Sequence, residues 1–469
     1  MKKLTYIIAV AFISINICAC SKKADFKALS EPSVLISSPI SDVGCIAPTA
    51  PAISAGIKGT MLAGKTYNIC GNVIVDVKDT LIVQEGVTIN FNGNYGIGVK
   101  GTLICLGTKA KPIYFTSPGA VKTDQIGADP SKDVAFEGRW TGIIGGPTAN
   151  KIILKWAHIE FAGGKPSGDL ATLSKNSYPL FFQNPNGILV FEDSWIYGSI
   201  DDPIRTVGGK IAIMRNTFEK CGYTGGEALN AKGGTIGDFA YNLCIGIATN
   251  GPKLSNSGAL PGVPGTNVRM YNNTIVNCGY RRSAAGRGGS INLEQDAAGM
   301  AYNNLMVNCK FGIRIVQNPM ADTLNTKYGY NYTYADIATV ADQIYPSKSL
   351  SVAITKAQPT DIPKPADFLP AGWNPGDTYT ANTAILGANN PQFINGPIPL
   401  PAGASLVDIS TVGNYNFALK LTSPCIGKGF TGFKAKGDVP IDLIYGATEL
   451  TPPGRDIGAF QTDGTGNHH

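Results

Sequence analysis

The sequence predicts an all-β protein whose short strands stack in successive coils, the architecture called a parallel β-helix. Two observations predict it. Short apolar runs recur at a period in the twenties, and the phrase YNNTIVNC at Tyr271–Cys278 returns as YNNLMVNC at Tyr302–Cys309. The composition agrees, because 57 of the 469 residues are glycine and only 15% are charged, which is typical of a strand-rich chain with many turns. A hydrophobic content of 43% is enough for a sizeable core.

Three short strands are predicted in each repeat. The first three sets of runs are Val73–Val75, Thr80–Val83 and Val87–Phe91; Gly96–Val99, Thr102–Gly107 and Pro112–Ser117; and Thr141–Ile144, Lys151–Trp156 and Ala157–Gly164. The expected aligned pairs are Val75 with Val99, Leu81 with Leu103 and Ile89 with Ile113, at spacings of 24, 22 and 24 residues. Such a period fits coils in which each strand pairs in parallel with its equivalent one coil away, about 4.8 Å distant. A single coil cannot bury its inward face, so stacking creates the core.

The repeated phrase predicts columns of identical side chains. The phrases that share its template are Asp193–Gly198, Asn216–Cys221, Asn273–Cys278 and Asn304–Cys309, with Tyr241–Gly246 as a looser copy. Equivalent positions of successive coils lie over one another, so an asparagine at a turn is expected to bond to the asparagines above and below it in a ladder of amides. We expect Cys221, Cys278 and Cys309 to pack as small apolar groups in the interior and not to form a metal site.

The other cysteines predict one disulfide. Cys18 and Cys20 lie in the N-terminal signal, and the chain contains no CxxC pair, which disfavours structural zinc and covalent haem. Cys45 and Cys70 both lie at the entry to the folded part, and we expect them to form a disulfide, which export permits.

The first residues are typical of an export signal. Lys2 and Lys3 precede the apolar run Leu4–Ile17, which is too short to span a bilayer comfortably. The run ends in Ile-Cys-Ala-Cys, and this resembles the signal of bacterial lipoproteins, in which the last cysteine, here Cys20, is acylated and becomes the N-terminus. The resemblance implies a lipid anchor in the cell envelope, at the outer membrane. An ordinary secretory peptide and a short membrane anchor are the alternatives.

The chain is predicted to contain six segments. These are the signal over residues 1–19, an N-terminal linker and cap over 20–55, the coils over 56–319, an irregular insertion over 320–385, a closing segment over 386–461 and a tail over 462–469. Within the insertion, Ala335–Tyr345 has helical spacing with Asp336 as a candidate N-cap, and Gln358–Asp377 is rich in proline.

Two parts of the chain resemble a known group of proteins. TLIVQEGVTINF at 80–91 and GTLICLGTKAKPIYFTS at 101–117 resemble the opening coils of pectate-lyase-like β-helix lipoproteins of Gram-negative bacteria. Asn389–Ile394, Phe417–Gly429 and Arg455–Gln461 resemble their closing segment. The resemblance covers residues 56–461 and implies a right-handed coil, in agreement with the usual hand of parallel crossovers. It implies no single function, because lyases, hydrolases, adhesins and phage tailspikes share this fold.

One strand face carries the candidate functional residues. Five runs line up across the coils: Leu180–Gln183, Ile204–Val207, Ala228–Lys232, Ile291–Glu294 and Ile313–Val316. Alternation places Ile204, Leu229, Ile291, Leu293, Ile313 and Ile315 inward, and Phe181, Arg205, Asn230, Lys232, Asn292, Glu294 and Arg314 outward. Aromatic, amide, cationic and carboxylate groups in a line are what an extended polysaccharide needs, so we expect a glycan to bind along this exposed sheet. The alternative is the solvated face of a structural or adhesive surface protein.

The same residues allow a second function, that of a polysaccharide lyase. β-Elimination from a uronic-acid glycan needs a cation against the sugar carboxylate and a base for the adjacent proton, and Lys232, Arg205 and Arg314 are the candidates for these roles. The resemblance implies calcium as the cofactor of such a lyase, although Glu294 and Asp296 alone supply few of the oxygen ligands that calcium needs. No other cofactor is expected.

Two further classes are disfavoured. A hydrolase of the polygalacturonase type relies on clustered aspartates and a Gly-His-Gly segment, whereas Asp201 and Asp202 are adjacent and His158, His468 and His469 lie outside any such segment. The net charge of +6 is spread along the chain without a basic block, so no nucleic-acid partner is expected.

Overall fold

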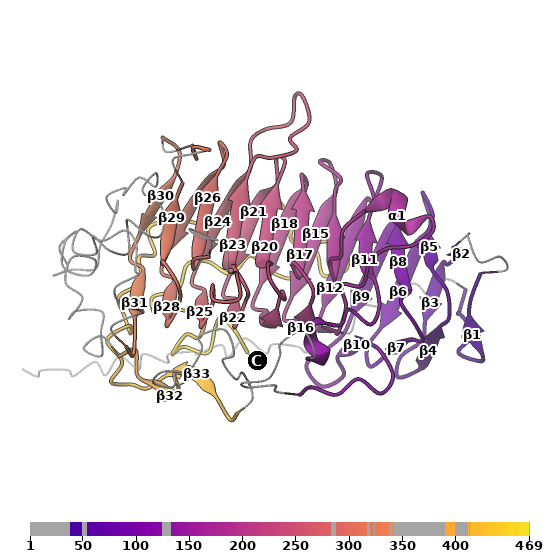
Figure 1. The fold of residues 1–469 in the computed structure, drawn as a ribbon, viewed down its shortest axis with the longest axis horizontal. Helices are drawn as coiled ribbons and strands as arrows, with labels where there is room; N and C mark the ends of the chain where they lie inside the picture. Colours follow the sequence, from indigo (N-terminus) through magenta and orange to yellow (C-terminus); the bar gives the residue numbers. More distant parts are fainter. Residues whose placement is uncertain are drawn as a thin grey trace, which may run out of the picture. The chain divides into compact units, whose positions relative to one another are not determined.

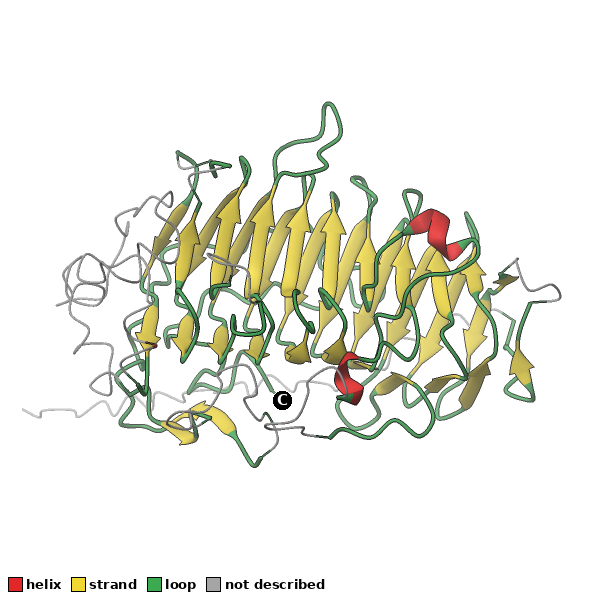
Figure 2. Ribbon diagram, in the orientation of Figure 1, coloured by secondary structure: helices red, strands yellow, loops and turns green. Residues whose placement is uncertain are grey.

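The computed structural model is a right-handed parallel β-helix, as the sequence predicts (Figures 1 and 2). The structure describes residues 38–48, 54–123, 133–282, 288–316, 319–322, 324–337, 340, 390–398, 411 and 413–468. The coils contribute one strand each to three sheets, and every pairing within these sheets is parallel.

The strands follow in strict rotation through the three sheets. The first sheet contains β1 (Cys45–Ile46), β4 (Thr66–Ile69), β7 (Thr88–Phe91), β10 (Ile113–Thr116), β13 (Ala157–Glu160), β16 (Trp195–Ser199), β19 (Thr217–Cys221), β22 (Leu243–Ile245), β25 (Thr274–Val276), β28 (Leu305–Val307) and β31 (Tyr332–Tyr334). The second contains β2 (Ala55–Gly56), β5 (Val73–Val75), β8 (Gly96–Val99), β11 (Gly142–Gly145), β14 (Leu180–Phe182), β17 (Ile204–Val207), β20 (Glu227–Lys232), β23 (Asn250–Ser255), β26 (Ile291–Glu294) and β29 (Ile313–Ile315). The third contains β3 (Gly59–Met61), β6 (Thr80–Gln84), β9 (Thr102–Leu106), β12 (Lys151–Lys155), β15 (Ile188–Glu192), β18 (Lys210–Met214), β21 (Ile236–Ala240), β24 (Asn267–Tyr271), β27 (Ala298–Tyr302) and β30 (Lys327–Gly329). Two short helices interrupt the coils, η2 (Val134–Phe136) and α1 (Leu170–Leu173).

The predicted register is correct for two of the three aligned pairs. Val75 pairs with Val99, and Leu81 pairs with Leu103. Ile89 pairs with Phe115 and not with Ile113. The error arises because the connection between β9 and β10 is longer than the one between β6 and β7: Leu106 and Tyr114 are eight positions apart, whereas their partners Gln84 and Thr88 are four apart. Apolar alternation is satisfied by either Ile113 or Phe115.

The interior is one continuous apolar core. The residues predicted to point inward from the second sheet, Ile204, Leu229, Ile291, Leu293, Ile313 and Ile315, all belong to it, and each is at most 2% exposed. Fully burying one such side chain contributes roughly 1.5–3 kcal/mol, so the stacked columns supply the main driving force for the fold.

The asparagines of the repeated phrase form the predicted ladder. Their side-chain amides bond in sequence along the coils: Asn216 to Asn242 at 2.9 Å, Asn242 to Asn273 at 3.1 Å, Asn273 to Asn304 at 2.8 Å and Asn304 to Asn331 at 2.9 Å. Each internal amide also bonds to backbone groups; Asn273, for example, donates to the Phe239 carbonyl at 3.1 Å. The ladder therefore pairs a buried column of amides completely, which is the condition for keeping polar groups inside.

The ladder corrects one alignment. The backbone N–H of Ser194 donates to the side chain of Asn216 at 3.0 Å, and Trp195 pairs with Thr217, so Ser194 and not Asp193 occupies the ladder position of its coil. The asparagines that directly precede the ladder positions have a different structural role. Asn272 and Asn303 have φ values of 50° and 58°, in the left-handed region that asparagine tolerates better than most residues.

The cysteines also lie where the sequence places them. Cys45 and Cys70 form a disulfide with their Cα atoms 5.8 Å apart. Cys221, Cys278 and Cys309 are buried free thiols within the apolar core. Their column is not continuous, because Ile247 lies between Cys221 and Cys278, and its backbone N–H donates to the Cys278 sulfur at 3.4 Å.

The two ends of the coil stack extend beyond the predicted boundaries of residues 56 and 319. At the start, β1 and β2 already pair with β4 and β5, and at the end, β30 and β31 continue two of the sheets to Tyr334. In the closing segment, β32 (Phe393–Asn395) pairs antiparallel with β33 (Asn416–Leu419). Most of the expected insertion and the whole signal with Cys20 lie outside the described residues. Within the described part of the chain, neither helix has the length and apolar character needed to cross a membrane.

Replacing a ladder asparagine will destabilise the coils. Asn273→Ala removes the acceptor of the Asn242 backbone and side-chain N–H groups and one donor to the Phe239 carbonyl, and each unpaired buried group costs about 1–3 kcal/mol, so we expect a loss of about 2–4 kcal/mol in urea unfolding. The matched control is Asn186→Ala on the exposed turn before β15, for which we expect a change within about 0.5 kcal/mol. Equal losses in the two variants would refute the structural role of the ladder.

Candidate functional site

The candidate residues form one line across the outer face of the second sheet. Their register runs through six successive strands from β14 to β29: Phe181, Arg205, Asn230, Lys253, Asn292 and Arg314. We call these six residues the outer row. Lys232 and Glu294 lie two positions further along β20 and β26 and flank the row.

Lys253 is the member of the row that the sequence does not reveal. It lies on β23, whose sequence NGPKLS begins with asparagine, glycine and proline, residues that strands disfavour. The sequence pattern therefore does not predict this strand, and the expected alignment passes directly from Asn230 to Asn292. The signal that identifies the strand is the alternation of Leu254 between Lys253 and Ser255, which is the pattern of its neighbours.

The row faces away from the core, but contrary to the expectation of an exposed sheet it is mostly buried. Asn230, Asn292 and Arg314 have exposed fractions of 1%, 3% and 4%. Arg205 and Lys232 are only half-buried. The row is therefore a mostly buried polar surface, and its charged groups interact far more strongly than they would on a solvated sheet.

Asp202 and Arg205 form the ionic centre of the row. Asp202 is fully buried, and its Oδ2 accepts from the Arg205 Nε at 2.7 Å and from the Asn230 Nδ2 at 3.0 Å. Its Oδ1 accepts from the backbone N–H of Glu227 at 2.8 Å. Burial acts to raise the pKa of Asp202, but the hydrogen bonds from Glu227 and the charge of Arg205 outweigh it, and the pKa lies below its ordinary value. Asp202 is therefore an ionised carboxylate.

Glu227 has the opposite character. It opens β20, is 7% exposed and accepts hydrogen bonds from the Asn230 and Asn250 amides at 3.1 and 3.3 Å. Burial, followed by the negative charge of Asp202 and the hydrogen bond between the two carboxyl groups, raises its pKa well above the ordinary value. Glu227 therefore holds its proton more tightly than an ordinary glutamic acid does.

The remaining charges surround this pair. Lys253 lies 2.9 Å from Glu294 and 3.8 Å from Glu227, and Asn292 donates to Glu294 at 3.2 Å. Arg314 donates to the Gly288 carbonyl at 3.0 Å. Asp201 precedes Asp202, and burial and the Asp202 charge raise its pKa to about 6.

Three amide oxygens of this site are unpaired. The Oδ1 atoms of Asn230, Asn250 and Asn292 are inaccessible to solvent and find no hydrogen-bond partner within the described residues. Leaving such an acceptor unpaired costs about 1–3 kcal/mol, so three of them within one polar surface are a strong departure from ordinary packing.

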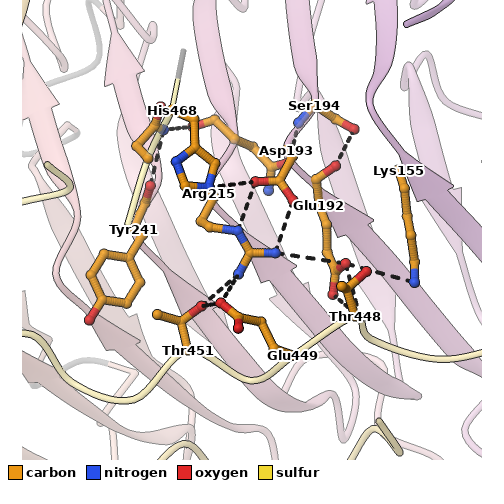
Figure 3. Close-up of polar contacts among 12 residues, drawn as sticks. Lys155, Glu192, Asp193, Ser194, Arg215, Tyr241, Thr448, Glu449, Thr451 and His468 are labelled. Carbon is orange, nitrogen blue, oxygen red and sulfur yellow. Dashed lines mark hydrogen bonds and ion pairs between the residues drawn. The ribbon is translucent and has the colours of Figure 1, made fainter. Parts of the chain in front are cut away.

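A second buried ionic cluster lies elsewhere, where the C-terminal segment crosses the coils (Figure 3). At its centre, Arg215 holds Asp193 through two hydrogen bonds of 2.7 and 2.9 Å and donates to the Thr451 hydroxyl at 2.6 Å. Glu192, fully buried beside Arg215, accepts two hydrogen bonds from the backbone N–H of Thr448 at 3.0 and 3.1 Å.

This cluster fastens the C-terminal segment to the coils. Lys155 extends it by donating to the Leu443 carbonyl at 3.0 Å, and the His468 ring lies 3.7 Å from Asp193. Burial raises the pKa of Glu192, with Lys155 and Arg215 opposing the shift. Because its partners include backbone groups of residues 443–451, the cluster is a structural clasp and not a site for a ligand.

Other features of the described residues are weaker candidates for a functional site. A cavity of about 440 Å³ lies between the loops of the third sheet and Tyr445, where Lys78, Lys100 and Lys151 line it without a buried titratable group. Across the described ranges, no three His, Cys, Asp or Glu side chains are close enough together to bind a metal. Glu294, one of the two expected calcium ligands, is bound by Lys253, and Asp296 is exposed beyond the end of β26.

Comparisons of the chain with family models, with curated proteins and with solved structures found no match.

Breaking the clasp will destabilise the protein strongly. Arg215→Met leaves Asp193 buried without the cation that holds it and leaves Glu192 with Lys155 alone, and an uncompensated buried charge costs about 3–5 kcal/mol, so we expect a large fall in the free energy of unfolding and faster proteolysis of the C-terminal segment. The control is Arg139→Met, whose half-exposed ion pair with Glu137 is worth at most about 1 kcal/mol. A similar loss in both variants would contradict the clasp.

Proposed function

We propose that the protein is an envelope lipoprotein that binds an extended acidic glycan along the outer row. The observation that carries the proposal is the line of cationic and amide side chains that the register sets on successive strands: Arg205, Asn230, Lys253, Asn292 and Arg314. Hydrogen-bonding and charged groups repeated about every 4.8 Å along one sheet face suit an extended sugar chain.

The charge balance of the row favours an acidic glycan. Arg205 is paired with Asp202, and Lys253 is paired with Glu294. Lys232 has no ion pair among the described residues, and the elevated pKa of Glu227 disfavours its negative charge, so the row is electrostatically suited to an acidic ligand. The Phe181 end of the row is closed by a buried apolar cluster, in which Phe181 stacks against Tyr178 at 5.7 Å and the Arg205 guanidinium lies 4.6 Å from the Tyr178 ring.

The location follows from the sequence. The signal that ends at Cys20 supports acylation of that residue and attachment to the outer membrane, and the similarity to pectate-lyase-like lipoproteins of Gram-negative bacteria agrees with it. A lipid anchor would hold the β-helix at the envelope, where polysaccharides are abundant.

Removing the unpaired cation will weaken glycan binding without unfolding the protein. We choose Lys232→Gln because Arg205→Ala would leave Asp202 buried without its cation. One charge-assisted contact contributes about 1–2 kcal/mol, so we expect the Kd for polygalacturonate, measured by affinity gel electrophoresis, to rise about 5- to 30-fold. The exposed Lys420→Gln is the control and should keep the affinity of the wild type. Unchanged mobility of the Lys232 variant would exclude the row as the binding surface.

A second candidate function, that of a uronide lyase, is favoured by one observation on Lys232. Burial, followed by the charges of Arg205 and Lys253, lowers the pKa of the Lys232 amine, which is the change that a general base of an elimination requires.

The unsaturated product of a lyase absorbs in the ultraviolet, so a panel of uronic-acid polymers tests this candidate directly. If Lys232 is the base, we expect absorbance to grow with time and Lys232→Gln to lower the rate by about 100-fold or more. Absence of the product with every polymer, with and without calcium, ends the lyase candidate and leaves the binding proposal in place.

A further inference from the structure

The cavity of about 440 Å³ at the start of the third sheet is lined by lysines from three successive coils. Lys78 lies in the turn before β6, Lys100 lies in the turn before β9, and Lys151 is the first residue of β12. The register brings these turns together, because Thr80, Thr102 and Lys151 pair as the first residues of the three strands. The volume lies within the range of about 300–1,000 Å³ that is typical of sites for small molecules.

The protein itself neutralises these lysines only in part. Among the described residues, Lys78 and Lys151 form no ion pair, and Lys100 lies 3.9 Å from the exposed Asp76. The Asp442 carboxylate acts on Lys151 from nearby, but no acidic residue is among the described residues that line the cavity. Like charges around one space repel each other, and the walls of a cleft focus their field. An anion bound in the cavity would therefore relieve this repulsion.

Tyr445 gives the cavity an aromatic wall. Its ring is 43% exposed, and Val77, which is 53% exposed, lines the same space. The Lys151 Nζ lies 5.0 Å from the centre of the Tyr445 ring. The Asp442 Oδ1 fixes the loop that carries this ring, because it accepts from the backbone N–H groups of Ile444 and Tyr445 at 2.9 Å each. The cavity thus adds exposed apolar surface, on which the C–H face of a sugar ring can pack, to its cations.

Hydroxyl and amide groups complete the lining. Thr80, Thr102, Thr148 and Asn150 all border the cavity, and none of them is buried. The Thr148 hydroxyl donates to the Lys100 carbonyl at 3.0 Å. The side chains of the other three form no hydrogen bond with a described residue and are open to solvent. They are therefore available to the hydroxyl groups of a ligand.

We propose that this cavity binds a single acidic sugar residue. The lysines lie against its anionic group, the threonine hydroxyls and the amide against its ring hydroxyls, and Tyr445 against a face of its ring. The volume and the neutral hydrogen-bonding groups favour a sugar over a bare anion. The cavity lies at the turns that lead into the third sheet, apart from the outer row on the second sheet, so this site does not depend on glycan binding by the row.

Four small probes separate the contributions of charge and ring. The Kd of the full chain is measured by NMR titration with D-galacturonate, D-galactose 6-phosphate, D-galactose and inorganic phosphate. We expect an acidic sugar to bind with a Kd of about 1 mM or lower, and the carboxylate and phosphate arms identify which anionic group is preferred. Galactose lacks the charge and phosphate lacks the ring, so we expect both to bind at least about tenfold more weakly.

Variants locate the site. We expect Lys151→Gln and Tyr445→Ala each to raise the Kd of the acidic sugar at least about fivefold, whereas Tyr445→Phe keeps the ring and should stay within about twofold of the wild type. The controls are the exposed Lys175→Gln and, in the outer row, Lys232→Gln, and both should leave this Kd unchanged. Circular dichroism checks that each variant is folded.

The outcomes separate this site from the outer row. If neither acidic sugar binds more tightly than galactose, or if Lys151→Gln keeps the affinity of the wild type, the inference is overturned. If Lys232→Gln weakens binding and Lys151→Gln does not, the sugar occupies the outer row, and the inference fails while the proposed function stands. Phosphate that binds as tightly as the acidic sugars would make the cavity a site for simple anions and refute the sugar.

Discussion

The structure depends on the register of its parallel strands. Each strand pairs with its equivalent one coil away, at about 4.8 Å, and nearly every position therefore has a direct neighbour above and below it. An apolar residue at an inward position extends a column of the core, as Ile204 and Leu229 do. A polar residue at such a position must find its partner within the column, because water cannot reach it. This requirement explains why Asn273 and Asn304 recur at the same place in the phrase and why their amides bond to each other.

The buried polar groups of the ladder and the clasp contrast with those of the outer row. In the asparagine ladder and in the clasp around Arg215, donors and acceptors meet at normal distances, and their partners include backbone groups of the next coil or of the C-terminal segment. The outer row instead sets cationic and amide side chains on successive strands, and among the described residues the amide oxygens of Asn230 and Asn292 find no donor. The clasp is satisfied by the chain itself, which is why we place function in the row and not in the clasp.

Electrostatics within the row separates the roles of similar residues. Asp202 and Glu227 carry the same chemical group, yet hydrogen bonds from Glu227 and the charge of Arg205 lower the pKa of the first against the effect of burial, whereas burial and the charge of Asp202 raise the pKa of the second. Lys253 and Lys232 also differ, because Lys253 lies between two carboxyl groups, whereas Lys232 has none within ion-pair distance among the described residues. Burial amplifies these differences, since the interaction of charges grows as water is excluded.

The sequence by itself determined the coil, its three strands and the asparagine column, because coils that stack in register require similar residues at a regular spacing along the sequence. It also predicted most of the outer row, from Phe181 to Arg314, by simple alternation. It could not identify Lys253, because the strand that carries it begins with Asn250, Gly251 and Pro252, which are residue types that strands disfavour. Only the tertiary structure showed that the row is buried, that Asp202 and Glu227 meet across two coils, and that three amide oxygens are unpaired. These properties depend on how the side chains of neighbouring coils and their turns pack, and alternation along one strand carries no information about that packing.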